Sequence, residues 1–156
     1  MRHLAASFLI LLLACLARPA AAQDREVPYW ATLRVDEVNM RVGPSEAYPI
    51  SWVYRREGLP VKVVRVRQGW RLVEDPDGER GWIVARLLNP KRGAIVIGEG
   101  LADMRAGAAS GADLLWRVEA GVVGTLGNCE DGWCRFEVER RKGWVRAERL
   151  WGAGNP

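Results

Sequence analysis

The sequence predicts an all-β fold in which one small, five-stranded module occurs twice after an N-terminal export signal. Three observations lead to this prediction. Residues 1–22 have the pattern of a signal peptide. The second half of the chain repeats the first half at an almost constant spacing. Short valine-rich runs alternate with glycine and proline, and no segment after residue 22 keeps a helical period, so strands and turns are favoured over helices.

The export signal begins with Arg2 and His3, continues through an uncharged apolar run, and ends in three alanines before Gln23. This pattern predicts cleavage near Gln23 and a periplasmic or secreted protein. Two alternatives remain open. A retained membrane anchor needs about 20 apolar residues, and this run is shorter, so we expect no membrane span. Lipidation of Cys15 is the second alternative, because the residues before it resemble a lipoprotein signal.

The internal repeat is defined by six anchors that recur in the same order after 62 to 64 residues. The matched anchors are Met40-Arg41-Val42-Gly43 with Met104-Arg105-Ala106-Gly107, Trp52 with Trp116, Gly58 with Gly121, Gly69-Trp70 with Gly132-Trp133, Gly81-Trp82 with Gly143-Trp144, and Leu88 with Leu150. The spacing shortens by two residues along the repeat, so each shortening should fall in a turn. We expect one module over residues 30–92 and a second over residues 93–151, with a connector too short to leave the modules much freedom.

The elements of one module follow from local residue chemistry. Runs of apolar and alternating residues are expected to form strands, and they lie at residues 30–35, 52–55, 61–67, 70–74 and 81–84. Residues 39–50 contain Gly43-Pro44 and Pro49 and are expected to be a long irregular loop. Residues 75–78 are a strong turn signal, and residues 85–88 are expected to form one short helical turn. Together these elements make a five-strand meander of the size of a small barrel.

Two cysteines flank a predicted hairpin turn in the second module. Cys129 and Cys134 bracket Asp131-Gly132, a pair favoured in two-residue turns because both positions tolerate positive φ. In this register Glu130 and Trp133 form the hydrogen-bonded pair nearest the turn, and the cysteines face each other at the next position. Their Cα atoms then lie close enough for a disulfide in an oxidising compartment, which we predict. A redox or zinc site would need further ligands that the chain after residue 22 lacks.

The ordered set of motifs resembles the bacterial SH3 domain family over nearly all of residues 30–151. The motifs are the run from Val38 to Ser45, then Gly58, Val61-Lys62-Val63, Gly69-Trp70, Gly81-Trp82-Ile83 and Leu87-Leu88. The resemblance implies two SH3-like barrels of a kind found in cell-envelope proteins and cell-wall hydrolases, where they target peptidoglycan or protein partners. It implies no catalytic activity. The second copy departs from the pattern, with Asp103 in place of Asn39 and alanines in place of Pro44-Ser45, so its loop cannot be assumed to do the same work.

Charge and composition exclude several classes of function. Removal of the signal would leave 21 basic and 19 acidic residues, a net charge of +2 without the concentrated basic patch that nucleic acid needs. The only histidine, His3, would also be removed, and no phosphate-binding loop or metal-ligand spacing is present. Asp75 and Asp77 lie in a turn signal and are interpreted as turn residues. We therefore expect no enzymatic activity, no cofactor, no metal site and no nucleic-acid partner.

Four residues of the first module are candidates for ligand binding. Trp70 begins a strand after a glycine and could line a groove, whereas Trp82 and its counterpart Trp144 are assigned to the core. Arg41 could bind a ligand carboxylate, although an arginine that ties down its own loop is the alternative interpretation. Tyr48 and Tyr54 have no counterpart in the second copy.

The expected function is recognition of a cell-wall ligand by the first module. Residues 30–92 have a net charge of +4 and residues 93–156 a net charge of −1, so an acidic group of the ligand would meet the first module. We expect a non-catalytic envelope protein that binds peptidoglycan peptide or glycan, with a largely structural second module. The alternatives are an adaptor that binds another envelope protein and a targeting subunit for a separately encoded cell-wall enzyme.

Overall fold

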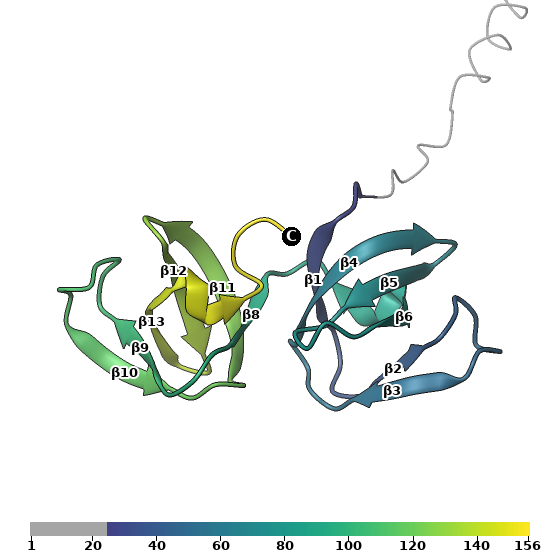
Figure 1. Cartoon of the computed structure of the whole chain (residues 1–156), viewed down its shortest axis with the longest axis horizontal. Helices are drawn as coiled ribbons and strands as arrows, with labels where there is room; N and C mark the ends of the chain where they lie inside the picture. The colour runs from purple at the N-terminus through teal and green to yellow at the C-terminus, as the bar shows by residue number, and fades with distance from the viewer. Residues whose placement is uncertain (1–24) are drawn as a thin grey trace, which may run out of the picture.

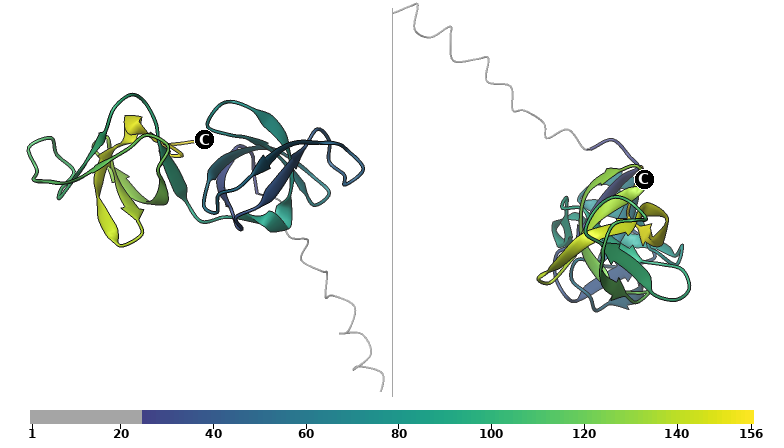
Figure 2. Two further views of the ribbon diagram at one scale, coloured as in Figure 1. Left: turned by 90° about the horizontal axis from the view of Figure 1, so that it is seen from below. Right: turned by 90° about the vertical axis from the view of Figure 1, so that its left-hand side faces the viewer.

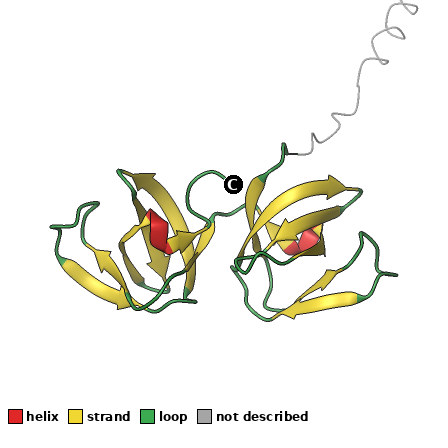
Figure 3. Ribbon diagram, viewed as in Figure 1, coloured by secondary structure: helices red, strands yellow, loops and turns green. Residues whose placement is uncertain are grey.

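The computed structural model describes residues 25–156, which form two β-sheets side by side along the long axis of the molecule (Figures 1 and 2). Within these residues the only helical elements are two single turns of 3-10 helix, η1 (Ala85–Leu87) and η2 (Ala147–Arg149), drawn in red in Figure 3. The predicted all-β class is confirmed, and η1 lies where a short helical turn was expected. The signal peptide and the lipidation alternative at Cys15 lie outside the described residues.

The two sheets have the same strand order. The first consists of β1 (Tyr29–Leu33), β2 (Val38–Arg41), β3 (Ile50–Tyr54), β4 (Pro60–Arg67), β5 (Trp70–Glu74), β6 (Arg80–Val84) and β7 (Leu88–Asn89). The second consists of β8 (Gly93–Val96), β9 (Ala102–Arg105), β10 (Leu114–Val118), β11 (Val123–Glu130), β12 (Trp133–Val138), β13 (Arg141–Arg146) and β14 (Leu150–Trp151). The orders are β3-β2-β6-β5-β4-β1-β7 and β10-β9-β13-β12-β11-β8-β14. The order shows that the repeat seen in the sequence is a repeat of topology.

The sheet differs from the expected five-strand meander in two ways. The strand β2 occupies part of residues 39–50, which were expected to be loop throughout. Val38 and Met40 are buried while Asn39 between them is exposed, and this alternation is too short to be recognised beside a long loop. In addition, β1 pairs with β4 and with β7 and not with the next strand along the chain. The sheet therefore curls on itself, and β3 is left at one edge.

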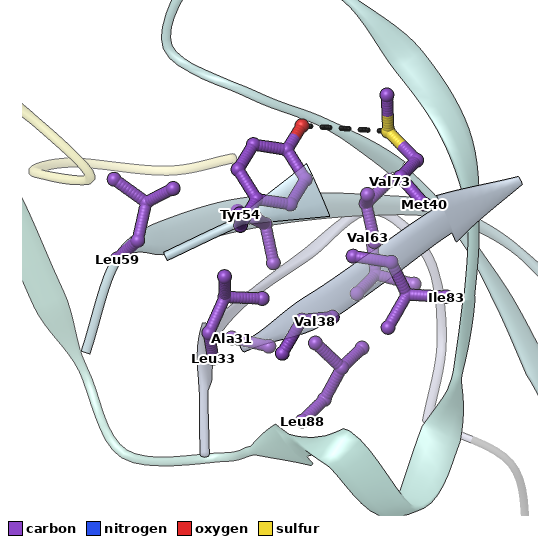
Figure 4. Packing of buried hydrophobic residues seen from close by; sticks show 11 residues of the cluster. Ala31, Leu33, Val38, Met40, Tyr54, Leu59, Val63, Val73, Ile83 and Leu88 are labelled. Carbon is purple, nitrogen blue, oxygen red and sulfur yellow. Dashed lines mark hydrogen bonds between the residues drawn. The ribbon is translucent and has the colours of Figure 1, made fainter. Parts of the chain in front are cut away.

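Each sheet encloses its own apolar core. The first core is drawn in Figure 4 and consists of Ala31, Leu33, Val38, Met40, Tyr54, Leu59, Val61, Val63, Val73, Ile83 and Leu88. The second consists of Ala94, Val96, Ala102, Met104, Val118, Leu126, Cys134, Phe136, Val145 and Leu150. Trp82 and Trp144 are also buried, as predicted. Their neighbours Gly81 and Gly143 are glycines because an added Cβ would overlap a buried methionine side chain in each module.

The predicted hairpin and its disulfide are present in the second module. Cys129 is paired with Cys134 and Glu130 with Trp133, as the register requires. Asp131 and Gly132 have φ values of 49° and 76°, the positive values of a two-residue hairpin turn. The Cα atoms of the cysteines lie 4.0 Å apart, and their sulfur atoms are bonded. The pairing was predictable because the turn residues fix the register of the strands on either side of it.

The modules are joined by more than the connector between β7 and β8. The Trp30 ring meets the Trp151 ring edge to face, with centroids 4.8 Å apart, and Trp30 Nε1 donates a hydrogen bond to the Gly154 carbonyl at 3.1 Å. Ile95 and Val123 of the second module pack against the first core. The C-terminal segment accordingly lies between the two modules in Figure 1. The second module thus supplies one wall of the surface described next.

Candidate functional site

The first module exposes apolar side chains along its edge strand. Trp52 and Ile50 of β3 are 60% and 46% exposed, and Tyr48 in the preceding loop is 47% exposed. The strand β3 is the outermost strand of its sheet, so these side chains have no neighbouring strand beyond them to cover them. Exposed aromatic and branched side chains that lie together are characteristic of binding surfaces.

The loop before β3 is held in shape by its own residues. Arg41 Nη1 donates a hydrogen bond to the Tyr48 carbonyl at 2.7 Å, and Arg105 Nη1 donates the matching bond to the Ala112 carbonyl at 2.8 Å. Of the two interpretations of Arg41, the contacts agree with an arginine that ties down its own loop. The Tyr48 ring lies over Gly43, where a Cβ would overlap it. Tyr48 is therefore presented in a fixed position beside β3.

A groove of about 450 Å³ lies between β3 and the turn that joins β5 to β6. Its apolar lining consists of Met40, Trp52, Tyr54, Leu59, Pro76 and Ile95, and its polar lining consists of Ser51, Asp75, Asp77, Glu79 and Arg80. Ile95 belongs to β8, so the second module closes one end. Met40 and Trp52 are cross-strand partners, so their side chains lie on the same side of the sheet, and both line the groove.

A buried tyrosine and a buried carboxylate fix the wall of this groove. The Tyr54 hydroxyl donates to Asp75 Oδ2 at 2.8 Å and also contacts the Met40 sulfur at 3.4 Å (Figure 4). Asp75 Oδ1 accepts the backbone N–H groups of Asp77 and Glu79 at 3.0 and 2.9 Å. Asp75 is thus a turn residue, as interpreted from the sequence. Burial, followed by the hydrogen bond to Asp75, raises the pKa of Tyr54 far above its ordinary value.

The second module lacks this construction. Val118 occupies the position of Tyr54, since each is paired with the first residue of the preceding strand. The turn between β12 and β13 consists of residues 139–140 alone, so it has no room for the hydrogen bonds that Asp75 accepts. The groove wall is therefore a feature of the first module.

The rim of the groove is acidic although the first module as a whole is basic. Arg80 Nε donates to Glu74 Oε2 at 2.8 Å, and Lys62 binds the other oxygen of Glu74. The hydrogen bonds from Lys62 and then from Arg80 lower the pKa of Glu74, so Arg80 is already neutralised by an ionised partner. Within residues 25–156, the Asp77 and Glu79 carboxylates have no ion-pair partner. The groove thus combines an apolar floor with two unpaired negative charges.

The four residues expected to bind ligand do not form one cluster. Arg41 is the last residue of β2 and bonds to Tyr48 in the loop. Tyr54 is 6% exposed and lines the groove with its hydroxyl already bonded. Trp70 is half-buried at the opposite end of β5 from Asp75 and does not line the groove. In the sequence, Trp52 was recognised only as an anchor of the repeat and not as a binding candidate. Its exposure depends on the edge position of β3, which the sequence pattern did not reveal.

Two further properties concern the part of the chain that the structure describes. Over residues 25–156, no group of three or more histidine, cysteine, aspartate or glutamate side chains is placed to hold a metal ion. In the same residues, no helix has the length and apolar character needed to cross a membrane.

Comparison with known families gives a match in both halves of the chain. The family model described as "Bacterial SH3 domain" matches residues 34–90 and residues 98–152. The two matches fall on the two sheets and together cover more than half of the sequence. A curated Bacillus subtilis (strain 168) protein with the name "Putative N-acetylmuramoyl-L-alanine amidase YrvJ" is 23% identical over 135 residues, which are 80% of this chain and 26% of that protein.

Solved structures that match parts of this chain include NlpC2 and NlpC1 from Trichomonas vaginalis and an NlpC/P60 family protein from Bacillus cereus ATCC 10987. Their sequence identities are 14%, 15% and 13%, and their TM-scores are 0.37, 0.37 and 0.35. They are matched over 82%, 83% and 78% of this chain and over 49%, 48% and 55% of their own chains. The chain thus spans about a quarter of the curated relative and about half of each solved protein.

Proposed function

The chain belongs to the bacterial SH3 domain family in both of its halves, and on this premise we propose that it is an exported, non-catalytic protein that binds peptidoglycan peptide or glycan through its first module. The observation that carries the proposal is Trp52, which is 60% exposed and lines a groove with fixed walls. An indole offers a flat apolar face with a polar N–H, which suits both sugar rings and peptide. A ligand that buries this ring would remove its apolar surface from water, which favours binding.

The remaining support comes from chemistry and from the relatives. The bond between Cys129 and Cys134 suits an oxidising compartment, which agrees with export through the signal at residues 1–22. The curated relative is named for an amide bond of N-acetylmuramoyl-L-alanine, a component of peptidoglycan. Because this chain spans only about a quarter of that protein, it is the binding role and not the amidase activity that we carry over.

One observation favours the adaptor role as a second candidate. Val42, Tyr48 and Ile50 are exposed together with Trp52 on and before the edge strand, and this row extends away from the groove. An edge strand with exposed apolar side chains can take up an added strand from a protein partner. A targeting subunit for a separate wall enzyme would combine both activities.

Sedimentation with purified cell-wall sacculi tests the proposal. We expect the full chain to sediment with sacculi, and Trp52→Ala and Tyr48→Ala to weaken binding by about 1 to 3 kcal/mol, the range for an aromatic anchor. Trp70→Ala is the matched control, because Trp70 lies away from the groove. Thermal melts verify that each variant is folded. Loss of binding by Trp70→Ala with retention by Trp52→Ala would move the site to the β4–β5 hairpin. A folded chain that does not sediment at all would leave the adaptor role.

A further inference from the structure

The two modules present a tryptophan at the same structural position. Trp52 is the cross-strand partner of Met40, and Trp116 is the cross-strand partner of Met104. Both methionines are buried, and both tryptophans are exposed on the edge strand of their sheet. The surroundings of one indole can therefore be compared directly with those of the other.

In the second module a cation of the same chain lies over this indole. The guanidinium carbon of Arg141 lies 4.8 Å from the centroid of the Trp116 ring. A guanidinium at this distance from an indole face is attracted by the negative potential of the ring. Arg141 is the first residue of β13, two positions before Gly143, the glycine that packs against Met104.

In the first module the matching position holds the opposite charge. Gly81 packs against Met40 as Gly143 packs against Met104, and Glu79 lies two positions before Gly81. Glu79 lines the groove beside Trp52 together with Asp77, and neither carboxylate has an ion-pair partner within residues 25–156. No cation of the described residues lies over the Trp52 ring. The first module thus has the indole without a cation over it. At the position that corresponds to Arg141, it has the carboxylate of Glu79.

Within residues 25–156, the one cationic side chain that lines the groove is already engaged. Arg80 lines the groove, but its Nε and Nη2 both donate to Glu74 Oε2, at 2.8 and 2.5 Å. Moving Arg80 over the indole would break both bonds and leave Glu74 with Lys62 alone. Arg80 is therefore not the counterpart of Arg141.

From this comparison we propose that the groove of the first module binds a cationic side chain of a peptide, an ammonium or guanidinium group at the end of an aliphatic stem. The stem lies on the Trp52 ring and the apolar floor at Met40, and the charge lies between the ring face and the carboxylates of Glu79 and Asp77. The proposal rests on the proposed function in that it assigns a ligand chemistry to the same groove. It also reconciles a basic module with an acidic groove, because a wall peptide has carboxylates as well as an amine.

Titration of the full chain with a synthetic lysine-containing peptide, followed by heteronuclear NMR, tests this assignment. Replacement of the lysine by norleucine or by Nε-acetyl-lysine keeps the stem and removes the charge. We expect the lysine peptide to shift the Trp52 indole resonance. The uncharged peptides should bind at least about tenfold more weakly than the lysine peptide. Equal binding of the three peptides would overturn the proposal, since the groove would then recognise only an apolar stem.

Charge variants of the protein give the decisive comparison. Glu79→Gln should weaken binding of the lysine peptide about fivefold. Glu79→Arg, which copies the charge of Arg141 in the second module, should abolish binding of this peptide. Glu46→Gln is the matched control, because it makes the same charge change on the loop of the same module and away from the groove. In the other direction, Arg141→Glu should uncover Trp116 and create a second lysine-dependent shift there. If Glu79→Gln and Glu46→Gln act alike, the carboxylate has no role and the proposal fails.

Sedimentation of the same variants with sacculi separates this proposal from wall binding. If Glu79→Arg abolishes binding to both the lysine peptide and the sacculi, the result supports a single groove that binds the wall through a cationic side chain. Lysine-dependent binding by a chain that does not sediment supports the cation site and overturns the wall as its source. Binding to sacculi that Glu79→Arg leaves unchanged, in a chain that shows no lysine preference, overturns the cation site and leaves wall binding intact.

Discussion

Tyr54 and Asp75 show how a buried polar pair can shape a surface. The Tyr54 hydroxyl and two backbone N–H groups together satisfy the Asp75 carboxylate, which is 6% exposed. An unsatisfied carboxylate at this depth would be costly, so each bond is worth more than one on the surface. The turn over residues 75–79 therefore holds Asp77 and Glu79 at the rim of the groove.

Removal of this hydroxyl should destabilise the first module. We expect Tyr54→Phe to lower the free energy of unfolding by about 1 to 3 kcal/mol, because a buried carboxylate oxygen would lose its donor. Urea denaturation measures the difference. Tyr48→Phe is the control, since Tyr48 is exposed, and this substitution should change stability by less than about 0.5 kcal/mol. Equal effects of the two substitutions would contradict a structural role for the Tyr54 bond.

The same pair predicts a loss of stability in alkali. The pKa of Tyr54 is raised by burial and by Asp75, so above pH 10.0, the ordinary value, the unfolded chain releases a proton that the folded chain keeps. This contribution to stability is fully present below that pH and declines above it, by at most about 1.4 kcal/mol per pH unit. Urea denaturation on both sides of pH 10.0 should show a steeper decline for the natural chain than for Tyr54→Phe. Parallel declines would refute the raised pKa.

Single residues were predictable where their role is local. Asp75 accepts N–H groups of its own turn, as interpreted from the sequence. Arg41 ties its loop, which is one of the two interpretations that the sequence left open. Trp52 and Trp70 could not be ranked in this way. One is exposed because β3 is an edge strand, and the other is half-covered at the start of an inner strand. The difference depends on the order of strands in space, which neighbouring residues do not encode.

At the scale of the element, the two β-hairpins that correspond in the modules share a turn and differ in how they are closed. Gln68 and Gly69 have positive φ like Asp131 and Gly132, and the first hairpin has Val66 opposite Arg71 where the second has the cysteine pair. The disulfide is thus an addition to a turn that forms without it.

Loss of the disulfide should weaken the second module without unfolding it. We expect reduction, or the double substitution Cys129→Ser and Cys134→Ser, to lower the free energy of unfolding by about 2 kcal/mol, the chain-entropy value for so short a loop. Urea denaturation with and without reductant measures this effect. Free-thiol titration of protein isolated from the envelope should find neither cysteine reactive. Two reactive thiols in that protein would contradict the bridge in its natural compartment.

Elements were predicted well where a turn fixes the register and poorly where a loop conceals a strand. The hairpin at Asp131-Gly132 was predicted to the residue pair because its turn admits one register. The strand β2 was missed because only Val38 and Met40 mark its buried face before Gly43-Pro44 begins the loop. Short strands gain their stability from partners that are distant in the chain, in this case β6.

At the scale of the whole molecule, the two modules form a single unit through an aromatic contact. Trp30 of the first strand contacts Trp151 and the Gly154 carbonyl, and Arg92 Nη2 donates to the Gly152 carbonyl at 2.7 Å. The two contacts of Trp30 join residues more than 100 positions apart in the sequence. From the sequence, the short connector alone predicted that the two modules have little freedom to move relative to each other. The contact between Trp30 and Trp151 was not predicted.

This junction should make the two modules unfold together. We expect a single calorimetric transition for the natural chain, and for Trp151→Ala either two separate transitions or a loss of about 2 kcal/mol in stability, because the edge-to-face contact and its burial disappear. Trp116→Ala is the control, since β10 lies on the side of its sheet away from the junction in Figure 1. Two transitions in the natural chain would show that the junction does not couple the modules.

The position of β1 between two neighbouring strands has a mechanical consequence. The strand is hydrogen-bonded to β4 on one side and to β7 on the other. Tension applied to the chain ahead of Tyr29 acts along the strand, so it loads the bonds of both ladders together in shear instead of opening them one at a time. Trp30 transmits part of the same load to Trp151 and thereby to the second module. A pull on the N-terminal side of the chain would therefore be shared by both modules through β1.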